Sequence, residues 1–333
     1  MAAANPMSLL YKRLASAGFK QKFVRETVLP SWWSDEVAST EAGYLEGLVI
    51  ISKHLGIQLG ALRNPVAELQ LENTHARFFK GPELASDENV AVAIAERAAR
   101  IALLGMPEAH KPAIVSAASI RRRLIGGGAS WIGFQELLQF CWNSNIPVIY
   151  VAHLPAGVKK LRAVTVSVDG RPAIVFFRGE KKPAKHLFPL AHEIGHIYLN
   201  HLEFVGLIID TEAEFSFNES TEREANRFAR ELLTGGEELP LNYNFPSIPS
   251  EIARGCKEYA NRLHIDPSFL VGEWEKKTKQ YKEARTAVNF YIQQDENALA
   301  MMAAELSRRI DWDLIPEESQ EYLLNLTRVG HAD

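Results

Sequence analysis

His192-Glu193-Ile194-Gly195-His196 is the stretch of sequence that decides the expected fold and chemistry. On a helix, two histidines four residues apart lie roughly 40° apart around the axis and about one turn apart along it. Their side chains can therefore hold one tetrahedral metal ion together, and Glu193 can reach a water molecule at that ion. The motif predicts a zinc centre with His192 and His196 as ligands and Glu193 as the general base of a hydrolase.

The residues around the motif predict a helix with two different faces. With His192 placed at 0°, His196 falls at about 40° and Glu193 at about 100°, whereas the apolar residues fall at about 140–260°. These apolar residues are Leu187, Ala191, Ile194, Ile197 and Tyr198. Gly195 lies beside the histidines and leaves room for another segment to approach closely. We expect the apolar face to be buried and the other face to present both imidazoles.

A catalytic zinc site needs a third protein ligand. His201 would fall at about 180°, on the buried face, if the helix continued, so we expect it to be structural. Carboxylates on a predicted helix over 218–233 are the next candidates. Glu222 and Glu224 both flank the apolar stripe of that helix, so periodicity does not choose between them. Thr221 and Glu224 also have the spacing of a capping box.

Upstream of the motif the period of the pattern changes from helical to extended. Residues 146–151, 163–168 and 173–177 read as strands, and Asp169-Gly170 is a hairpin turn signal. The edge of such a sheet could hold an extended peptide as an added strand. The expected fold class is α+β: mainly helical, with a small three-stranded antiparallel sheet packed on a zincin-like HExxH helix core.

A chain of 333 residues is expected to form more than one domain. The expected divisions are a helix-turn-helix-like helical domain at 1–65, a helical connector at 66–108, a zinc metallopeptidase core at 109–240 and a helical C-terminal region at 241–333. Within the first domain, residues 1–64 carry seven basic and five acidic residues, which is little positive charge for DNA binding. Pro30 and Trp32-Trp33 fall where a recognition helix would run, so we interpret this domain as degenerate or protein-binding.

Helical periodicity extends over much of the remaining chain. The predicted helices cover 8–17, 20–28, 40–56, 87–105, 110–124, 130–143, 250–263, 267–277, 296–309 and 317–328. Gly56 is expected to end the third of these as a left-handed C-terminal residue.

The composition is that of a soluble protein in a reducing compartment. The apolar runs are far shorter than a membrane span, and the first residues lack the apolar segment of a secretory signal. Cys141 and Cys256 have no CxxC spacing, and we interpret both as buried thiols. We therefore expect a cytoplasmic protein without membrane association.

The net charge of −4 hides a basic segment. Residues 158–187 carry eight Lys or Arg against two acidic residues, a local charge of +6. The favoured interpretation is a solvated hairpin rim. The alternative is a docking surface for an acidic segment or a nucleic acid. Its candidate residues are Lys159, Lys160, Arg162, Arg178, Lys181 and Lys182.

Three segments resemble the ImmA/IrrE family of metallopeptidases. They are FPLAHEIGH at residues 188–196, EREANRFA at 222–229 and LHIDPSFLVG at 263–272. The resemblance implies that Glu224 is the third ligand, beside His192 and His196, of one Zn²⁺ per chain. It also implies that the substrate is a partner protein, typically a transcriptional repressor or an antitoxin, in a stress response or in mobile-element control.

The leading functional expectation is thus a zinc endopeptidase of narrow specificity. The alternative is an antitoxin-like DNA- or protein-binding regulator whose zinc site is structural or vestigial. A metal-dependent hydrolase of small molecules is a third hypothesis, and it is weaker because a sheet next to an HExxH helix suits peptides.

Overall fold

Four short strands form the sheet on which the fold is built. The strands are β1 (Val148–Tyr150), β2 (Ala163–Val168), β3 (Arg171–Phe176) and β4 (Leu207–Asp210). Strands β2 and β3 pair antiparallel and form a hairpin. Asp169 and Gly170 occupy its two-residue turn with φ angles of 51° and 81°, as a type I′ turn requires. The hairpin predicted from Asp169-Gly170 is confirmed.

The predicted three-stranded antiparallel sheet is wrong in two respects. The sheet is mixed, with the order β1-β3-β2-β4, because β1 pairs parallel with β3 and places Val148 opposite Ile174. The chain leaves β1, crosses to β2 and returns as β3, so β3 lies between the other two strands. The fourth strand, β4, was not predicted; it follows the motif helix and pairs antiparallel with β2. Pro172 lies at the head of β3, a central strand, so it marks a strand start and not an edge.

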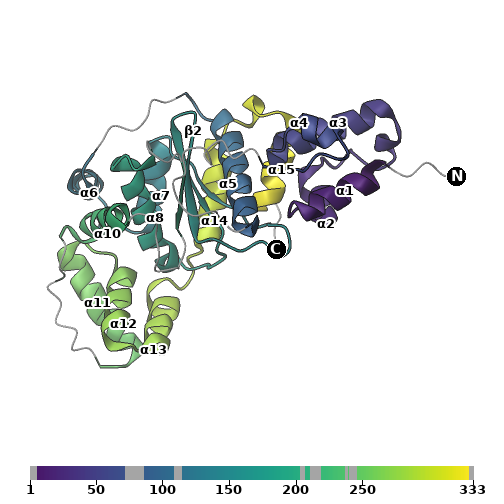
Figure 1. Ribbon diagram of the computed structural model, residues 1–333. Helices are drawn as coiled ribbons and strands as arrows, with labels where there is room; N and C mark the ends of the chain where they lie inside the picture. The colour runs from purple at the N-terminus through teal and green to yellow at the C-terminus, as the bar shows by residue number, and fades with distance from the viewer. Residues whose placement is uncertain are drawn as a thin grey trace.

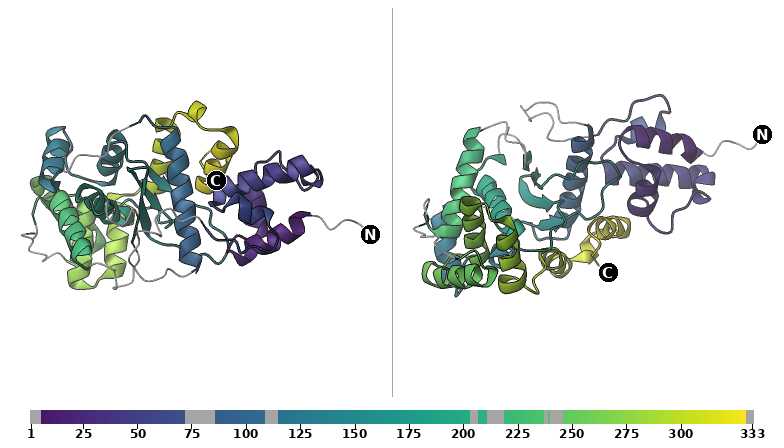
Figure 2. Two further views of the ribbon diagram at one scale, coloured as in Figure 1. Left: turned by 45° about the horizontal axis from the view of Figure 1, so that its top comes forward. Right: turned by 90° about the horizontal axis from the view of Figure 1, so that it is seen from below.

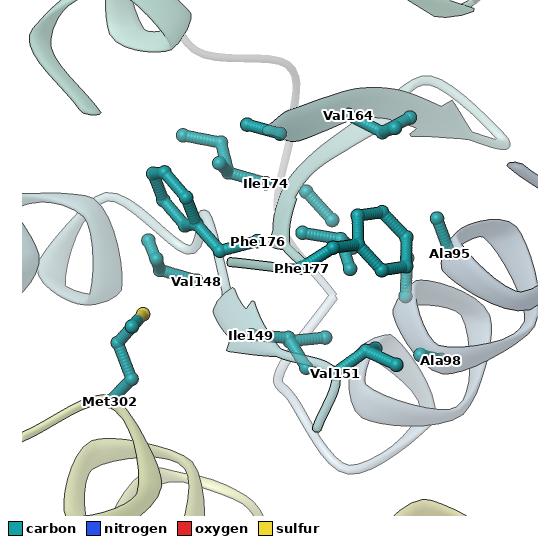
Figure 3. Close-up of a cluster of buried hydrophobic side chains, with 14 of the residues drawn as sticks. Ala95, Ala98, Val148, Ile149, Val151, Val164, Ile174, Phe176, Phe177 and Met302 are labelled. Carbon is teal, nitrogen blue, oxygen red and sulfur yellow. The ribbon is translucent and has the colours of Figure 1, made fainter. Parts of the chain in front are cut away.

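Helices cover both faces of the sheet (Figure 1). On one face α5 (Ser86–Leu104) packs on β2 and β3, and Figure 3 shows Phe177 and Val151 beside Ala95 and Ala98 of α5. On the other face, Phe176 and Val148 point toward helices on the opposite side, including α14 with its Met302 (Figure 3). Strands β2 and β3 are therefore buried on nearly every residue and lack the alternation of a sheet with one wet face.

The computed structural model describes residues 6–71, 86–108, 115–202, 207–210, 219–236, 239 and 246–329. Parts of the predicted connector at 66–108 and of the predicted helix at 110–124 lie outside these ranges. The described chain is mainly helical, so the α+β class is confirmed. Among these residues, no helix has both the length and the apolar character that a membrane span requires.

The N-terminal helices lie at one end of the molecule (Figures 1 and 2). They are α1 (Pro6–Ser16), α2 (Gln21–Phe23) with a π-helical turn at Val24–Val28, a 3-10 turn at Val37–Ser39, α3 (Glu41–Leu55) and α4 (Leu59–Arg63). Thr40 caps α3 by accepting a hydrogen bond from the backbone of Gly43, and Gly56 ends the helix with a φ of 66°. The predicted left-handed residue at Gly56 is confirmed, whereas the helix-turn-helix-like character of this region stays a prediction.

The remaining helices surround the sheet and extend to the C-terminus. They are α6 (Ala117–Gly126), α7 (Phe134–Asn143), α8 (Ala184–Tyr198), α10 (Glu219–Thr234), α11 (Pro249–Leu263), α12 (Pro267–Thr278), α13 (Tyr281–Ala287) with a π-helical turn at Val288–Ile292, α14 (Ala298–Arg309), a 3-10 turn at Trp312–Leu314 and α15 (Glu317–Thr327). Helix α13 and its turn were not predicted.

The last helix, α15, joins the N-terminal helices to the core. It packs on α5 and α3, and the ring of Tyr322 stacks on His54 of α3 at 4.4 Å between centroids. Cys141 and Cys256 are both buried free thiols, as predicted. Burial raises the pKa of Cys256 to about 12 and raises that of Cys141 as well, which keeps both thiols protonated.

Candidate metal centre

Helix α8 carries the motif into the interior, between the sheet and α10. His192 is 6% exposed, and Glu193 and His196 are fully buried. The sequence predicted one buried face and one face presenting the imidazoles. In the structure both faces are covered, because α10 packs along the face that carries the histidines (Figure 1). The site is therefore a desolvated one, in which electrostatic interactions are stronger than in water.

Gly195 sets how closely α10 approaches α8. A Cβ atom at Gly195 would lie 3.2 Å from both the Cα and the carbonyl oxygen of Ala225, and 3.3 Å from the Cβ of Phe228. The predicted close approach at Gly195 is confirmed. Because Ala225 is the contact point on α10, the residue one turn earlier, Glu222, lies on the same side of that helix and next to the histidines.

Three side chains meet at this contact. The Nε2 atoms of His192 and His196 lie 3.0 Å apart. Glu222 places Oε2 3.2 Å from Nε2 of His192 and Oε1 3.5 Å from Nε2 of His196. Donor atoms at about 2.0–2.1 Å from a tetrahedral zinc ion are about 3.3 Å apart, so these spacings fit such an ion. Two imidazoles and one carboxylate are also a donor set that zinc accepts.

This geometry brings Glu222, and not the predicted Glu224, to the two histidines, while the identity of the third ligand stays a prediction. Among the described residues, the group that could hold a metal ion is His192, His196 and Glu222. The side chain of Glu224 is 60% exposed, and its Oε2 lies 3.1 Å from Nε2 of His201. The reason is rotational: Glu224 is adjacent to Ala225 and points about 100° away from the contact face, whereas Glu222 is three residues before it.

Glu193 is held by a residue of the sheet that the sequence prediction missed. The hydroxyl of Thr165 on β2 donates a hydrogen bond of 2.5 Å to Oε2 of Glu193. Thr165 is fully buried. Its signal in the sequence is a polar residue in the otherwise aliphatic segment AVTV of β2. A hydroxyl placed there orients the carboxylate that would act as the general base.

Each motif histidine also has a contact on its second ring nitrogen. Nδ1 of His192 lies 3.1 Å from the amide oxygen of Asn226, and Nδ1 of His196 lies 2.9 Å from Nδ1 of His201. Burial lowers the pKa of His196 well below its usual value, and the nearby His192 and His201 lower it further. A neutral imidazole is the form that binds metal.

His201 reaches this position because α8 ends before it. The helix stops at Tyr198, and Asn200 adopts a left-handed conformation with a φ of 65°. The backbone amide of His201 then donates to the carbonyl of His196 at 3.0 Å, which folds the residue back over the last turn. The helical wheel placed His201 on the far side because it assumed that the helix continues. His201 contacts a motif histidine, His196, which the helical wheel did not predict, and its structural role stays a prediction.

An aromatic wall adjoins the centre on the side of α12. The ring of Phe188 lies 6.5 Å from that of His192 and stacks on Phe269 of α12 at 6.4 Å. Lys276 places its Nζ 5.6 Å from the Phe188 ring. His186, near the start of α8, has other contacts: its Nε2 is 2.7 Å from the carbonyl of Glu180, and its ring meets Phe176 edge-on.

The predicted basic docking surface is partly engaged in internal contacts. Lys159 forms an ion pair with Glu88 of α5 at 2.8 Å. Lys182 donates to the backbone carbonyls of Gln293 and Gln294 and so fastens the segment before α14. Arg162 and Arg178 are partly buried, whereas Lys160 and Lys181 are exposed. The role of these residues in docking stays a prediction.

A comparison with protein families gives a match over the part of the chain that contains these residues. Residues 147–245 match the family model Peptidase_M78, described as the IrrE N-terminal-like domain. The match contains the sheet, the motif helix α8 and helix α10, which together supply His192, His196, Glu222 and Glu193. A search of curated proteins gave no match. The resemblance seen in the sequence is thus confirmed over residues 147–245, which are similar to the Peptidase_M78 family of ImmA/IrrE-type metallopeptidases.

Proposed function

We propose that the protein is a zinc-dependent endopeptidase of narrow specificity, which cleaves a partner repressor or antitoxin in a stress or mobile-element response. The observation that carries the proposal is the group formed by buried His192 and His196 and partly exposed Glu222, with Glu193 next to His192 on the same helix, within residues that match the Peptidase_M78 model. Catalytic zinc sites characteristically use three protein ligands and keep a fourth position for water or substrate.

The residues of the centre divide the chemistry among them. His192, His196 and Glu222 would hold a zinc ion, which would supply Lewis acidity and lower the pKa of a water molecule to near neutrality. Glu193 takes the proton of the attacking water and delivers it to the leaving amine as the peptide bond breaks. Thr165 keeps the carboxylate of Glu193 in one orientation during both transfers.

The sheet supports a peptide as the substrate. Strand β4 stands at the end of the sheet order and pairs with β2 through Ile208, which lies opposite Thr165. Strand β4, and with it this edge of the sheet, lies one strand spacing, about 4.8 Å, beyond β2, whose Thr165 contacts the general base. An extended peptide added to that edge would run past the centre. The aromatic wall of Phe188 and Phe269 would contact an apolar side chain of such a peptide.

The identity of the partner rests on the resemblance to the family. Exposed Lys160 and Lys181 supply a site for an acidic segment of that partner, outside the centre itself. A protein substrate that docks through such contacts would explain narrow specificity, because cleavage then needs two separate surfaces to fit.

The test is to look beside the gene for one that encodes a helix-turn-helix repressor, and to measure proteolysis of that repressor by the full chain loaded with zinc. The wild type is expected to bind about one zinc and to cut the repressor. Glu193→Gln is expected to keep the zinc and to lose cleavage by about 100-fold or more, the usual contribution of a general base. Cleavage by Glu193→Gln at the wild-type rate would falsify the mechanism. Zinc binding without cleavage, together with salt-dependent binding of promoter DNA, would instead support the regulator hypothesis.

A further inference from the structure

Glu224, His201 and His196 form a continuous series that runs from the surface of α10 to the metal centre. Oε2 of Glu224 lies 3.1 Å from Nε2 of His201, and Nδ1 of His201 lies 2.9 Å from Nδ1 of His196. Nε2 of His196 then faces the other donors. We propose that Glu224 and His201 are positioning residues that fix the tautomer and orientation of His196 for metal binding. The proposal rests on the metal centre proposed above.

Once a metal ion is bound, only one arrangement of the ring hydrogens satisfies every donor and acceptor in this series. His196 must offer an unprotonated Nε2 to the ion, so its Nδ1 carries the hydrogen and donates it to His201. Nδ1 of His201 is then an acceptor, and its Nε2 carries the hydrogen and donates it to the Glu224 carboxylate. The reverse arrangement would leave the carboxylate facing an unprotonated nitrogen, which is repulsive.

The local backbone is arranged to make this series. Helix α8 ends just before His201, and Asn200 takes the left-handed conformation that turns the chain back. His201 is 9% exposed, so its two ring contacts replace the water that it would otherwise bind. Glu224 approaches from α10, the same helix that carries Glu222. One helix thus provides both a metal donor and the far end of the series.

The two motif histidines are supported unequally. His192 contacts a neutral amide, Asn226, whereas His196 is connected through His201 to a carboxylate. A carboxylate that polarises an imidazole raises its basicity as a ligand, which an amide does less strongly. Loss of such an outer contact typically costs 10- to 100-fold in metal affinity. We expect the larger effect on the side of His196.

Cobalt binding by the metal-free full chain tests the proposal, with Co²⁺ affinity measured by competition with a chelator and the visible spectrum recorded. His201→Leu removes both contacts and is expected to lower the affinity by about 10- to 100-fold and to shift the spectrum. Glu224→Gln removes only the charge, so a smaller loss of several-fold is expected. Glu231→Gln is the matched control on the same helix, about 13 Å along the axis from Glu222, and is expected to behave as wild type.

The outcomes separate this proposal from the proposed function. If the wild type binds no Co²⁺, the metal centre and the positioning series both fail. If the wild type binds it and both His201→Leu and Glu224→Gln bind it equally well, only the series fails. If His201→Leu does not fold, as judged by circular dichroism, the metal affinity of Glu224→Gln alone tests the positioning series. The side chain of Glu224 is largely exposed, so this variant is expected to fold.

A spectroscopic measurement on the wild type checks the direction of the series independently. In the zinc-loaded protein, nitrogen NMR of the histidine rings is expected to show His201 protonated at Nε2 and His196 protonated at Nδ1. A His201 ring protonated at Nδ1 alone would overturn the proposal, since it could not then accept from His196.

Discussion

Gly195 of α8 lies directly against Ala225 of α10, so closely that a Cβ atom on the glycine would stand 3.2 Å from the neighbouring backbone. This contact determines which carboxylate reaches the histidines. It places Glu222, one turn before Ala225, between the two imidazoles. The proposed metal centre therefore depends on helix packing as much as on the HExxH motif.

The first prediction concerns this contact. Gly195→Val is expected to push the two helices apart, because backbone atoms of a packed helix cannot yield as a flexible side chain does. Overpacking of this kind costs about 1–3 kcal/mol in the free energy of unfolding. Zinc affinity should fall together with this stability. Urea unfolding and a zinc titration measure the two effects. Gly272→Val is the matched control in α12, where a Cβ atom meets nothing within 4 Å. Equal stability of the two variants would contradict the packing argument.

The second prediction concerns the orientation of the general base. Thr165→Val keeps the shape of the side chain but removes the hydrogen bond to Glu193. A hydrogen bond to a charged group contributes about 1.5–3 kcal/mol, so kcat is expected to fall about 10-fold or more, with little change in KM and in bound zinc.

Two further variants of β2 make this test specific. Thr165→Ser retains the hydroxyl and should keep most of the activity. Ser167→Ala, two residues further along the same strand and less deeply buried, should behave as wild type. If Thr165→Val keeps full activity, the hydroxyl has no role in catalysis.

The third prediction concerns His54, which joins the N-terminal helices to α15. Its Nδ1 lies 2.7 Å from the carbonyl of Val28, and its ring stacks on Tyr322. Burial lowers the pKa of His54 to about 4, although the Val28 carbonyl partly opposes the shift. His54 of the unfolded chain binds a proton as the pH falls through 6.5, whereas His54 of the folded chain stays neutral. Neutral His54 therefore makes its full contribution to the free energy of unfolding above pH 6.5, and this contribution is lost as the pH falls toward 4.

The expected size of this pH effect is about 2 kcal/mol between pH 7 and pH 5. Urea unfolding of the wild type and of His54→Gln at the two pH values measures it. The variant should lose less stability on acidification than the wild type by about that amount. A difference that does not change with pH would show that His54 does not titrate in this way.

Local signals in the sequence were sufficient for much of the fold. Thr40 caps the start of α3, Gly56 ends that helix in the left-handed conformation, and Asp169-Gly170 forms the hairpin turn. Each of these features depends on residues that are neighbours in the chain. The parallel pairing of β1 with β3 depends on the path between strands, which local pattern does not encode. Strand β4 is four residues long and pairs with a strand far away in sequence, so periodicity could not reveal it.

For the candidate site too, local features could be predicted from the sequence and contacts between distant segments could not. The spacing of His192 and His196 within one helix was sufficient to predict that their side chains meet, and the role of Glu193 as general base stays a prediction. The choice between Glu222 and Glu224 needed the contact between two helices, and the helical wheel for His201 failed because the helix ends at Tyr198. Thr165 lies on a strand 28 residues from its partner Glu193, and only the tertiary fold brings them together.

The central claim is that His192, His196 and Glu222 hold one metal ion beside Glu193. Anomalous X-ray diffraction at the zinc edge, from crystals of the zinc-loaded full chain, tests it most directly. The account predicts one strong peak per chain, about 2.0–2.2 Å from the Nε2 atoms of His192 and His196 and from a carboxylate oxygen of Glu222. A peak ligated by Glu224 in place of Glu222, or no peak between the two histidines, would contradict it.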